Sequence, residues 1–208
     1  MMFKGGNEKR MEPINTDTQT AEFKVDIELL KRACGYILEA IGEDVNREGL
    51  VDTPKRFANF WKEFMEYDPG NLNVHFQSVR DDSMVVLRGI KTWSLCEHHL
   101  LPFSVNATVA YIPGDENCKV IGLSKLARIV QKHAHRPQIQ ERLAADIAAE
   151  ISELACTKHV AVVVSGVHLC MQMRGVKTSG EMFSSVMQGH FRDDQHTRTE
   201  FLTIMKMD

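Results

Sequence analysis

Apolar residues recur at intervals of three and four in two segments near the start of the chain, and this spacing predicts two amphipathic helices. The first helix begins after Asp26, a residue that can cap it. Its apolar positions are Ile27, Leu30, Cys34, Ile37 and Ile41. The second helix begins at Thr53-Pro54, where threonine is the expected N-cap and proline fits the first turn, and it ends at Asp68-Pro69-Gly70. Residues 25–70 are therefore predicted to form a helical segment.

The middle of the chain alternates between apolar and polar residues with a period of two, which is typical of strands. Val85 and Leu87 mark the first run and residues 105–111 form the second, so we expect an antiparallel pair. Helical spacing then returns in two segments that begin at Ser124 and at Pro137, each with an apolar stripe facing inward.

The last part of the chain is predicted to be β-rich. Residues 160–167 form an apolar run that we expect to continue as strand through His168-Leu169-Cys170. Residues 200–205 predict a last short strand. The order of helices, strands, helices and strands is typical of an α+β fold.

Composition agrees with one compact domain, because 43% of the 208 residues are hydrophobic and 25% are charged. Residues 1–24 lack hydrophobic periodicity and predict a flexible N-terminal arm. Residues 25–208 are expected to form a single domain, with its core in residues 83–208. The net charge of −3 gives no general attraction for nucleic acid or an anionic membrane, so neither is an expected partner.

The chain shows no secretory signal and no apolar run long enough to cross a membrane, so we expect it in the cytoplasm. Its five cysteines are odd in number, which favours reduced thiols over a disulfide framework. A cysteine with a special role is then expected to be a metal ligand or a nucleophile.

Cysteine and histidine gather in two short motifs, Cys96-Glu97-His98-His99 and His168-Leu169-Cys170. Thiolate and imidazole are preferred ligands of zinc. If the second motif is a strand, its His168 and Cys170 share a face, so one can bind a metal while the other moves protons. Spacing does not choose between His98 and His99 as a ligand, and any one of these residues also fits ordinary burial. Three ligands with an open fourth position would indicate a catalytic zinc site.

A second candidate site is the segment Gly122–Arg128. Ser124 can cap a helix whose free N–H groups favour an anion, and Lys125 and Arg128 lie one turn apart, so phosphate fits there. The alternative is a solvated basic helix face. Three more arginines can join the cluster if folding or assembly brings them near: Arg56, Arg136 and Arg174.

Glu141 follows the start of an apolar helix, so it lies either in the capping turn or at a ligand. Several nucleotide and hydrolase signatures are absent from the sequence: the P-loop, G-x-G-x-x-G and the G-x-S-x-G elbow. ATP hydrolysis by a P-loop, dinucleotide redox chemistry and α/β-hydrolase chemistry therefore lose their usual support.

Long motifs that occur in one order make the sequence resemble the GTP cyclohydrolase I family. They are Cys96–Phe103, Ala110–Pro113, Val120–Arg128, Arg136–Leu143, His168–Cys170 and Arg174–Val176. The resemblance runs from about Ile27 to the C-terminus. It implies the tunnelling fold, an antiparallel sheet backed by two helices, whose subunits close into a barrel and stack as two rings into a homodecamer.

The resemblance also implies a reaction, the zinc-dependent conversion of GTP to formate and 7,8-dihydroneopterin triphosphate at the start of pterin or folate biosynthesis. The implied zinc ligands are Cys96, His99 and Cys170, and the implied proton-transfer pair is His98 and His168. By resemblance, Ser124 lies near the ribose, and Gln140 and Glu141 bind guanine. The triphosphate is expected to contact Lys125, Arg128, Arg174 and, from a neighbouring subunit, Arg56.

Two other functions fit parts of the sequence. A nitrile reductase of the same fold would use a cysteine nucleophile and a nicotinamide cofactor, but the three-ligand zinc set argues against it. A non-catalytic protein stabilised by zinc would not need His98, His168 and a phosphate cluster beside the metal. Release of formate from GTP distinguishes the three functions.

Overall fold

The structure is a computed structural model, and it describes residues 24–73, 75–77, 83–113 and 119–207. The α+β class predicted from the sequence is confirmed. In chain order the described elements are α1 (Ile27–Ala40), α2 (Thr53–Met65), β1 (His75–Gln77), β2 (Val85–Cys96), β3 (Pro102–Tyr111), β4 (Lys119–Ile121), α3 (Leu123–Ala134), β5 (Pro137–Gln138), α4 (Gln140–Leu154), β6 (Val160–Gly166), α5 (Leu169–Gln172), β7 (Met182–Met187), α6 (His190–Asp193) and α7 (Gln195–Lys206).

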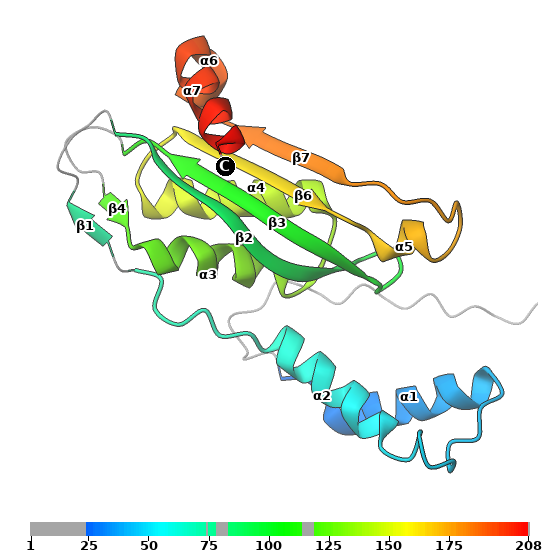
Figure 1. Ribbon diagram of the computed structural model, residues 1–208. Coiled ribbons are helices and arrows are strands. Elements are labelled where there is room, and N and C mark those ends of the chain that lie inside the picture. Colours follow the sequence, from blue (N-terminus) through cyan, green and yellow to red (C-terminus); the bar gives the residue numbers. More distant parts are fainter. Residues whose placement is uncertain (1–23, 74, 78–82, 114–118, 208) are drawn as a thin grey trace, which may run out of the picture.

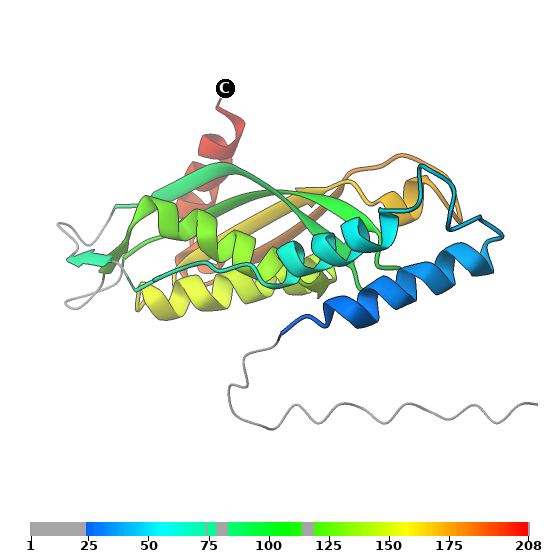
Figure 2. The ribbon, with the colours of Figure 1, turned by 90° about the horizontal axis from the view of Figure 1, so that it is seen from below.

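A five-stranded sheet in the order β5-β2-β3-β6-β7 forms the centre of the molecule (Figure 1). Strands β2, β3, β6 and β7 pair antiparallel, and the two-residue β5 pairs parallel with the end of β2. Helices α3 and α4 cover one face of the sheet, whereas α6 and α7 lie against the other face (Figures 1 and 2). The antiparallel sheet backed by two helices is therefore present, as expected.

Alternate residues of β6 enter hydrophobic clusters on opposite faces of the sheet, as the period of a strand requires. The cluster that includes residues of α3 and α4 takes Val160, Val162 and Val164. The cluster beneath α6 and α7 takes Ala161 and Val163, which pack with Phe191 and Phe201. All residues of β6 are buried, so this strand is covered on both faces.

The N-terminal helices α1 and α2 pack against each other and lie beside the rest of the chain (Figures 1 and 2). The ring of Phe64 contacts the imidazole of His135, with centroids 5.0 Å apart. Tyr67 stacks on the same imidazole at 4.4 Å, and its hydroxyl donates a hydrogen bond of 2.5 Å to Oε1 of Gln131. These contacts attach the helical segment to the C-terminal end of α3.

Helix α1 begins as predicted, because the Asp26 carboxylate accepts a hydrogen bond of 2.8 Å from the N–H of Leu29. Two other predicted caps are wrong. Thr53 is already the first residue of α2, whose N-cap is Asp52, and α2 ends at Met65, before the predicted stop. Ser124 lies within α3, because the chain leaves its extended conformation at Gly122, which is the N-cap.

The helix predicted to begin at Pro137 begins instead at Gln140. Pro137 and Gln138 are opposite Leu95 and Cys96 and form the edge strand β5. A proline is tolerated there because an edge strand does not need every N–H for the ladder.

Two segments predicted as strand are helical. Residues 169–172 form α5 rather than extending β6, and leucine, methionine and glutamine favour such a helical turn. His168 and Cys170 therefore do not share the face of a strand. Residues 200–205 belong to α7, which begins where the Asp194 carboxylate accepts hydrogen bonds from the N–H groups of His196 and Thr197. The edge strand β7 had no counterpart among the predicted elements.

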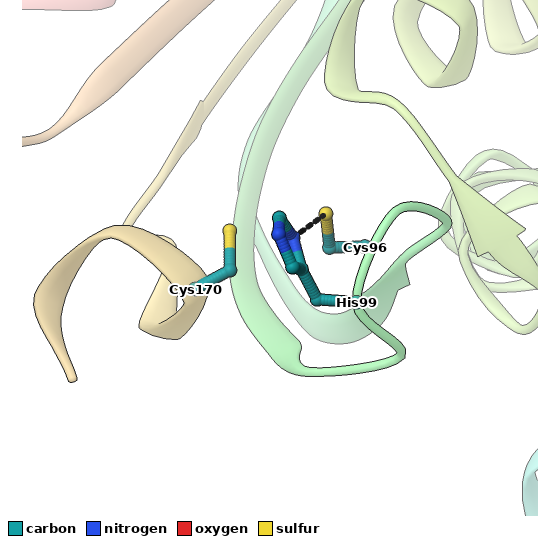
Figure 3. A group of neighbouring side chains, drawn as sticks. All are labelled: Cys96, His99 and Cys170. Carbon is teal, nitrogen blue, oxygen red and sulfur yellow. Dashed lines mark hydrogen bonds between the residues drawn. The ribbon is translucent and has the colours of Figure 1, made fainter. Parts of the chain in front are cut away.

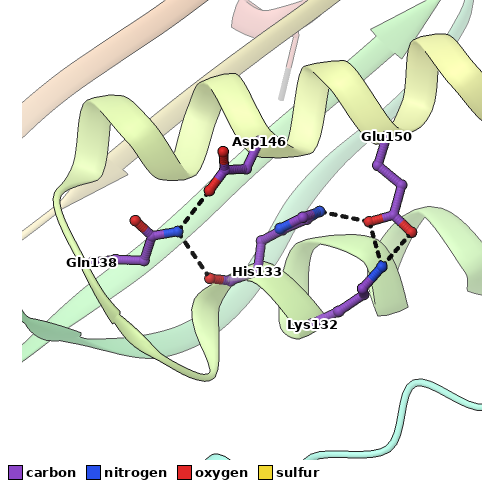
Figure 4. Close-up of polar contacts among 5 residues, drawn as sticks. All are labelled: Lys132, His133, Gln138, Asp146 and Glu150. Atoms are coloured by element: carbon purple, nitrogen blue, oxygen red, sulfur yellow. Dashed lines mark hydrogen bonds and ion pairs between the residues drawn. The ribbon is translucent and has the colours of Figure 1, made fainter. Parts of the chain in front are cut away.

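A polar cluster joins α3 to α4 on the side of the helices away from the sheet (Figure 4). Glu150 accepts hydrogen bonds from Lys132 Nζ at 2.8 and 2.9 Å, and it lies 2.5 Å from Nε2 of His133. Burial lowers the pKa of His133, and the charge of Glu150 opposes this shift. The side chain of Gln138, which is buried, donates to Asp146 at 2.9 Å.

The predicted N-terminal arm lies outside the described residues, apart from Lys24. In the described part of the chain, every helix is too short or too polar to cross a membrane. Cys34, Cys96 and Cys170 are free thiols, in agreement with the expected reduced state, and Cys118 lies outside the described residues.

Candidate active site

A tight turn at the end of β2 brings His99 back over Cys96. The carbonyl of Cys96 accepts hydrogen bonds from the N–H groups of His99 and Leu100, at 3.2 and 2.7 Å. Its own N–H donates to the carbonyl of Leu101 at 2.9 Å. Leu100 takes a positive φ of 53°, which lets the chain reverse within these few residues. The turn therefore places a thiol and an imidazole on the same side of the strand end.

Cys170 of α5 completes a group of three potential metal ligands (Figure 3). The ligand atoms of Cys96, His99 and Cys170 all lie within 4.8 Å of one another. Sγ of Cys96 is 3.7 Å from Nδ1 of His99, close to the separation of about 3.6 Å that tetrahedral zinc would give its sulfur and nitrogen ligands. The donor set and its spacing thus fit a bound metal ion such as zinc.

The two thiols of this group affect each other. Burial raises the pKa of the Cys170 thiol, and its hydrogen bond to Cys96 and the charge of Cys96 raise it further. A bound cation would favour both thiolates, because coordination replaces the proton on sulfur.

His98 lies beside this group and is exposed to solvent. Its Nδ1 is 3.7 Å from Sγ of Cys96, and its ring centroid is 6.2 Å from that of His99. Among the described residues, the group that could hold a single ion includes His99 rather than His98. His98 is therefore near enough to act at the same site without being a member of the ligand group.

His168 lies two residues before Cys170 and caps α5. Its imidazole stacks on the ring of Phe103, with centroids 4.4 Å apart and an interplanar angle of 6°. Burial lowers the pKa of His168, and the negative charge of Glu141 opposes the shift. The neutral imidazole is favoured, as suits a group that accepts and returns a proton near pH 7.

Gln140 and Glu141 begin α4 and differ sharply in exposure. Gln140 is buried, with 1% of its surface exposed, and its Oε1 lies 3.0 Å from Nε2 of His168. Glu141 is exposed and close enough to His168 to influence its pKa. The N-cap of α4 is Ile139, so the helix begins without a capping side chain. The carboxylate of Glu141 is thus available to a ligand beside His168.

Two arginines approach the turn that follows β2. Arg174 donates a hydrogen bond of 2.6 Å to Nε2 of His99, which brings a positive charge to the ligand group. Arg142 donates to Glu97 at 2.6 Å. Neither Glu97 nor Arg142 had a predicted role, yet their ion pair links the turn to the start of α4.

The predicted phosphate cluster lies elsewhere in the chain. Helix α3 follows β4, where the N–H of Ile121 donates at 2.8 Å to the hydroxyl of Tyr111. Tyr111 pairs with Val85, the first residue of β2, whereas Cys96 is the last. Strand β2 has 12 residues and spans roughly 36 Å at about 3.3 Å per residue. Lys125, near the start of α3, therefore lies towards the opposite end of the sheet from Cys96 (Figure 1).

The remaining basic residues also have local contacts. Arg128 donates a hydrogen bond of 3.0 Å to the carbonyl of Pro69. Arg56 is exposed on α2 and lies 3.4 Å from the carboxylate of Asp52. Arg174 is thus the one predicted triphosphate ligand that the described structure joins directly to the group of Cys96, His99 and Cys170.

Known proteins are similar in sequence to this chain over most of its length. The sequence model of the family described as GTP cyclohydrolase I matches residues 30–206. The chain belongs to the GTP cyclohydrolase I family. It is 48% identical over 182 residues to GTP cyclohydrolase 1 of Sulfurihydrogenibium sp., an alignment that covers 87% of this chain and 96% of that protein.

Further members of the GTP cyclohydrolase I family give the same result. The GTP cyclohydrolase 1 2 of Pseudomonas aeruginosa is 48% identical over 182 residues, with 85% of this chain and 99% of that protein covered. GTP cyclohydrolase 1 of Aquifex aeolicus is 44% identical over 183 residues, with 88% and 98% covered. The curled sheet with its helices is consistent with the tunnelling fold of this family. Membership supports GTP cyclohydrolase activity and identifies the chain as a hydrolase.

Proposed function

We propose that the protein converts GTP to formate and 7,8-dihydroneopterin triphosphate with Zn²⁺ as its cofactor, at the start of pterin or folate biosynthesis. The observation that carries this proposal is the group of Cys96, His99 and Cys170 beside the imidazole of His168. Cys170 and His168 belong to one short segment, so a metal ligand and a proton carrier lie close together. Hydrolysis of a purine ring can use both, the metal to activate water and the imidazole to transfer protons.

The chemistry explains why a metal is needed. Carbon 8 of guanine is a weak electrophile, and neutral water is a weak nucleophile. When bound by Cys96, His99 and Cys170, zinc supplies Lewis acidity that lowers the pKa of water toward neutrality. Cys96, His99 and Cys170 would supply three ligands to the ion, the number that is typical of catalytic rather than structural zinc sites.

We assign the proton transfers to His98 and His168. Opening of the imidazole ring, release of formate and closure of the pterin ring each require a proton to be delivered or removed. Burial lowers the pKa of His168 and so favours its neutral form, while His98 is exposed and has its Nδ1 3.7 Å from Sγ of Cys96.

Guanine and the triphosphate bind through different residues in this proposal. The exposed carboxylate of Glu141 accepts hydrogen bonds from N1–H and the exocyclic amine of guanine. Arg174, exposed beside His99, binds the triphosphate. At the other end of the sheet, Ser124 contacts the ribose, and Lys125 and Arg128 contact the triphosphate. Arg56 of α2 also contacts the triphosphate. The guanine contact expected for Gln140 stays a prediction.

A complete site requires more than one copy of the chain. The separation of roughly 36 Å along β2 keeps Lys125 away from the Cys96 end of the same sheet. Strand β7 is an edge strand of the five-stranded sheet and has unpaired backbone groups that pairing with a second copy would satisfy. We therefore propose a homo-oligomer, a decamer of two stacked pentamers, in which Lys125 and Arg128 of one copy face the Cys96 group of another.

The assay that tests the function measures formate and inorganic phosphate after the purified, zinc-loaded protein is incubated with GTP. Formate release without phosphate release supports the proposal. Phosphate release without formate would indicate a nucleotidase instead. His168→Asn provides a matched variant, because it should slow turnover while the zinc content stays unchanged. The cytoplasmic location expected from the sequence stays a prediction.

A further inference from the structure

Gln140 is surrounded by hydrogen-bond partners that fix which way its amide group points. Its Nε2 donates to the carbonyl of Val164 at 3.0 Å and to the carbonyl of Met182 at 3.0 Å. The hydroxyl of Ser184 lies 3.3 Å from the same nitrogen. A carbonyl oxygen can only accept, so the NH₂ group must face Val164 and Met182. The oxygen Oε1 is thereby directed to His168.

This orientation determines the proton arrangement of His168. Oε1 of Gln140 is an acceptor, and it lies 3.0 Å from Nε2 of the imidazole. The hydrogen bond forms only if Nε2 carries a proton. In the neutral ring the other nitrogen, Nδ1, then has the free lone pair. We propose that Gln140 is a positioning residue that holds His168 in the Nε2–H tautomer, with Nδ1 as the atom that exchanges protons with the substrate.

The surrounding packing favours this single arrangement. The ring of Phe103 lies parallel to the imidazole at 4.4 Å and prevents it from tilting. Gly166 allows the amide of Gln140 to approach, because a Cβ atom there would lie 2.9 Å from Oε1 and 2.2 Å from the carbonyl oxygen of Ser104. A side chain at position 166 would therefore displace the backbone or the amide that orients His168.

The inference rests on the proposed function, since it gives His168 a proton to transfer, but it assigns Gln140 a different task from the one expected by resemblance. Both hydrogens of the Gln140 amide have acceptors inside the fold, and 1% of the residue is exposed. A guanine base could reach this amide only after those bonds break. In this arrangement, recognition of the base falls to Glu141.

The two roles predict different kinetics for Gln140→Met, a variant of similar length without the amide. A positioning role predicts that kcat falls about 10-fold or more, in line with the contribution of a general acid or base. It also predicts that KM for GTP and the preference for GTP over inosine triphosphate change less than about twofold, because base recognition is intact. A rise in KM, or a reduced preference for GTP at unchanged kcat, would overturn the proposal in favour of base recognition.

Gln138→Met is a matched control. Gln138 is a second glutamine with 1% exposure, and it donates to Asp146 rather than to His168 (Figure 4). If loss of a buried amide matters only through stability, both variants should lower kcat equally. The positioning role predicts that Gln138→Met keeps its kcat within about twofold of the original enzyme.

Neutron diffraction on crystals of the unaltered, zinc-loaded protein tests the tautomer directly. The proposal predicts a deuteron on Nε2 of His168, directed to Oε1 of Gln140, and none on Nδ1 of the neutral ring. A deuteron on Nδ1 with a bare Nε2 would overturn it. This measurement does not depend on turnover. Absence of formate in the assay would contradict the proposed reaction, whereas the position of the deuteron tests the tautomer independently.

Discussion

The imidazole of His168 lies flat against the ring of Phe103, with an interplanar angle of 6° and centroids 4.4 Å apart. Phe103 is completely buried near the start of β3, and its backbone bridges to His168. The orientation of the imidazole is thus determined by the core of the sheet. This contact links the packing of the fold to the residue that we assign to proton transfer.

Phe103→Leu should lower kcat while the protein keeps its zinc, because leucine fills part of the space but offers no flat surface to the imidazole. Removing a buried ring should also lower the free energy of unfolding by about 1–2 kcal/mol. Steady-state kinetics, denaturant unfolding and zinc analysis of the same preparation check this result. Loss of zinc together with activity would instead mean that Phe103 supports the ligand group.

Cys170→Ser should lose bound zinc and activity together, since a hydroxyl is a poor substitute for a thiolate on this metal. Metal analysis of the purified protein checks the prediction. Cys156→Ser is the control, because Cys156 is exposed and its thiol contacts the carbonyl of Glu153. Full activity of Cys170→Ser without stoichiometric metal would rule out the proposed mechanism.

Glu141→Gln should weaken apparent transition-state binding of GTP by about 2–4 kcal/mol, because an amide presents a donor where guanine also presents one. The measurement is kcat/KM for GTP and for inosine triphosphate, which lacks the exocyclic amine, with both proteins. Deleting the amine should harm the original enzyme much more than the variant. Equal penalties would indicate that Glu141 does not contact the base.

Glu150→Gln should lower the free energy of unfolding by about 1–3 kcal/mol, because it leaves Lys132 and His133 without the carboxylate between α3 and α4. Glu153→Gln, on an exposed position of the same helix, should have little effect. Thermal unfolding of both variants checks the difference. If the Glu150→Gln variant melted at the same temperature as the Glu153→Gln variant, the polar cluster would contribute nothing to the stability of the protein.

The parts of the fold with a strong local signal could be predicted from the sequence. Asp26 before an apolar stripe located α1, and the period of two in residues 105–111 located β3. The wrong predictions arose where local preference was ambiguous. Residues 200–205 contain aromatic and β-branched side chains, yet they continue a helix that starts at the Asp194 cap. Phe201 and Met205, one turn apart, pack against the sheet and were the available helical signal.

The candidate site could be predicted only in part. The residue types at Cys96, His99 and Cys170 indicated a metal, but the expected strand geometry for Cys170 was wrong, because α5 and the turn after β2 bring the ligands together. The hydrogen bond between Gln140 and His168 depends on how α4 packs against β6 and β7. Such a contact between distant segments has no periodic signature in the sequence.

The conversion of GTP labelled with ¹³C at carbon 8 tests the central claim most directly. The zinc-loaded protein is incubated with this substrate, and the products are followed by carbon NMR and mass spectrometry. The account predicts that all of the label appears in formate, one formate per GTP consumed. The triphosphate product should contain no label, because carbon 8 leaves and two unlabelled ribose carbons enter the new ring. Retention of the label in a nucleotide product, with no labelled formate, would contradict the account.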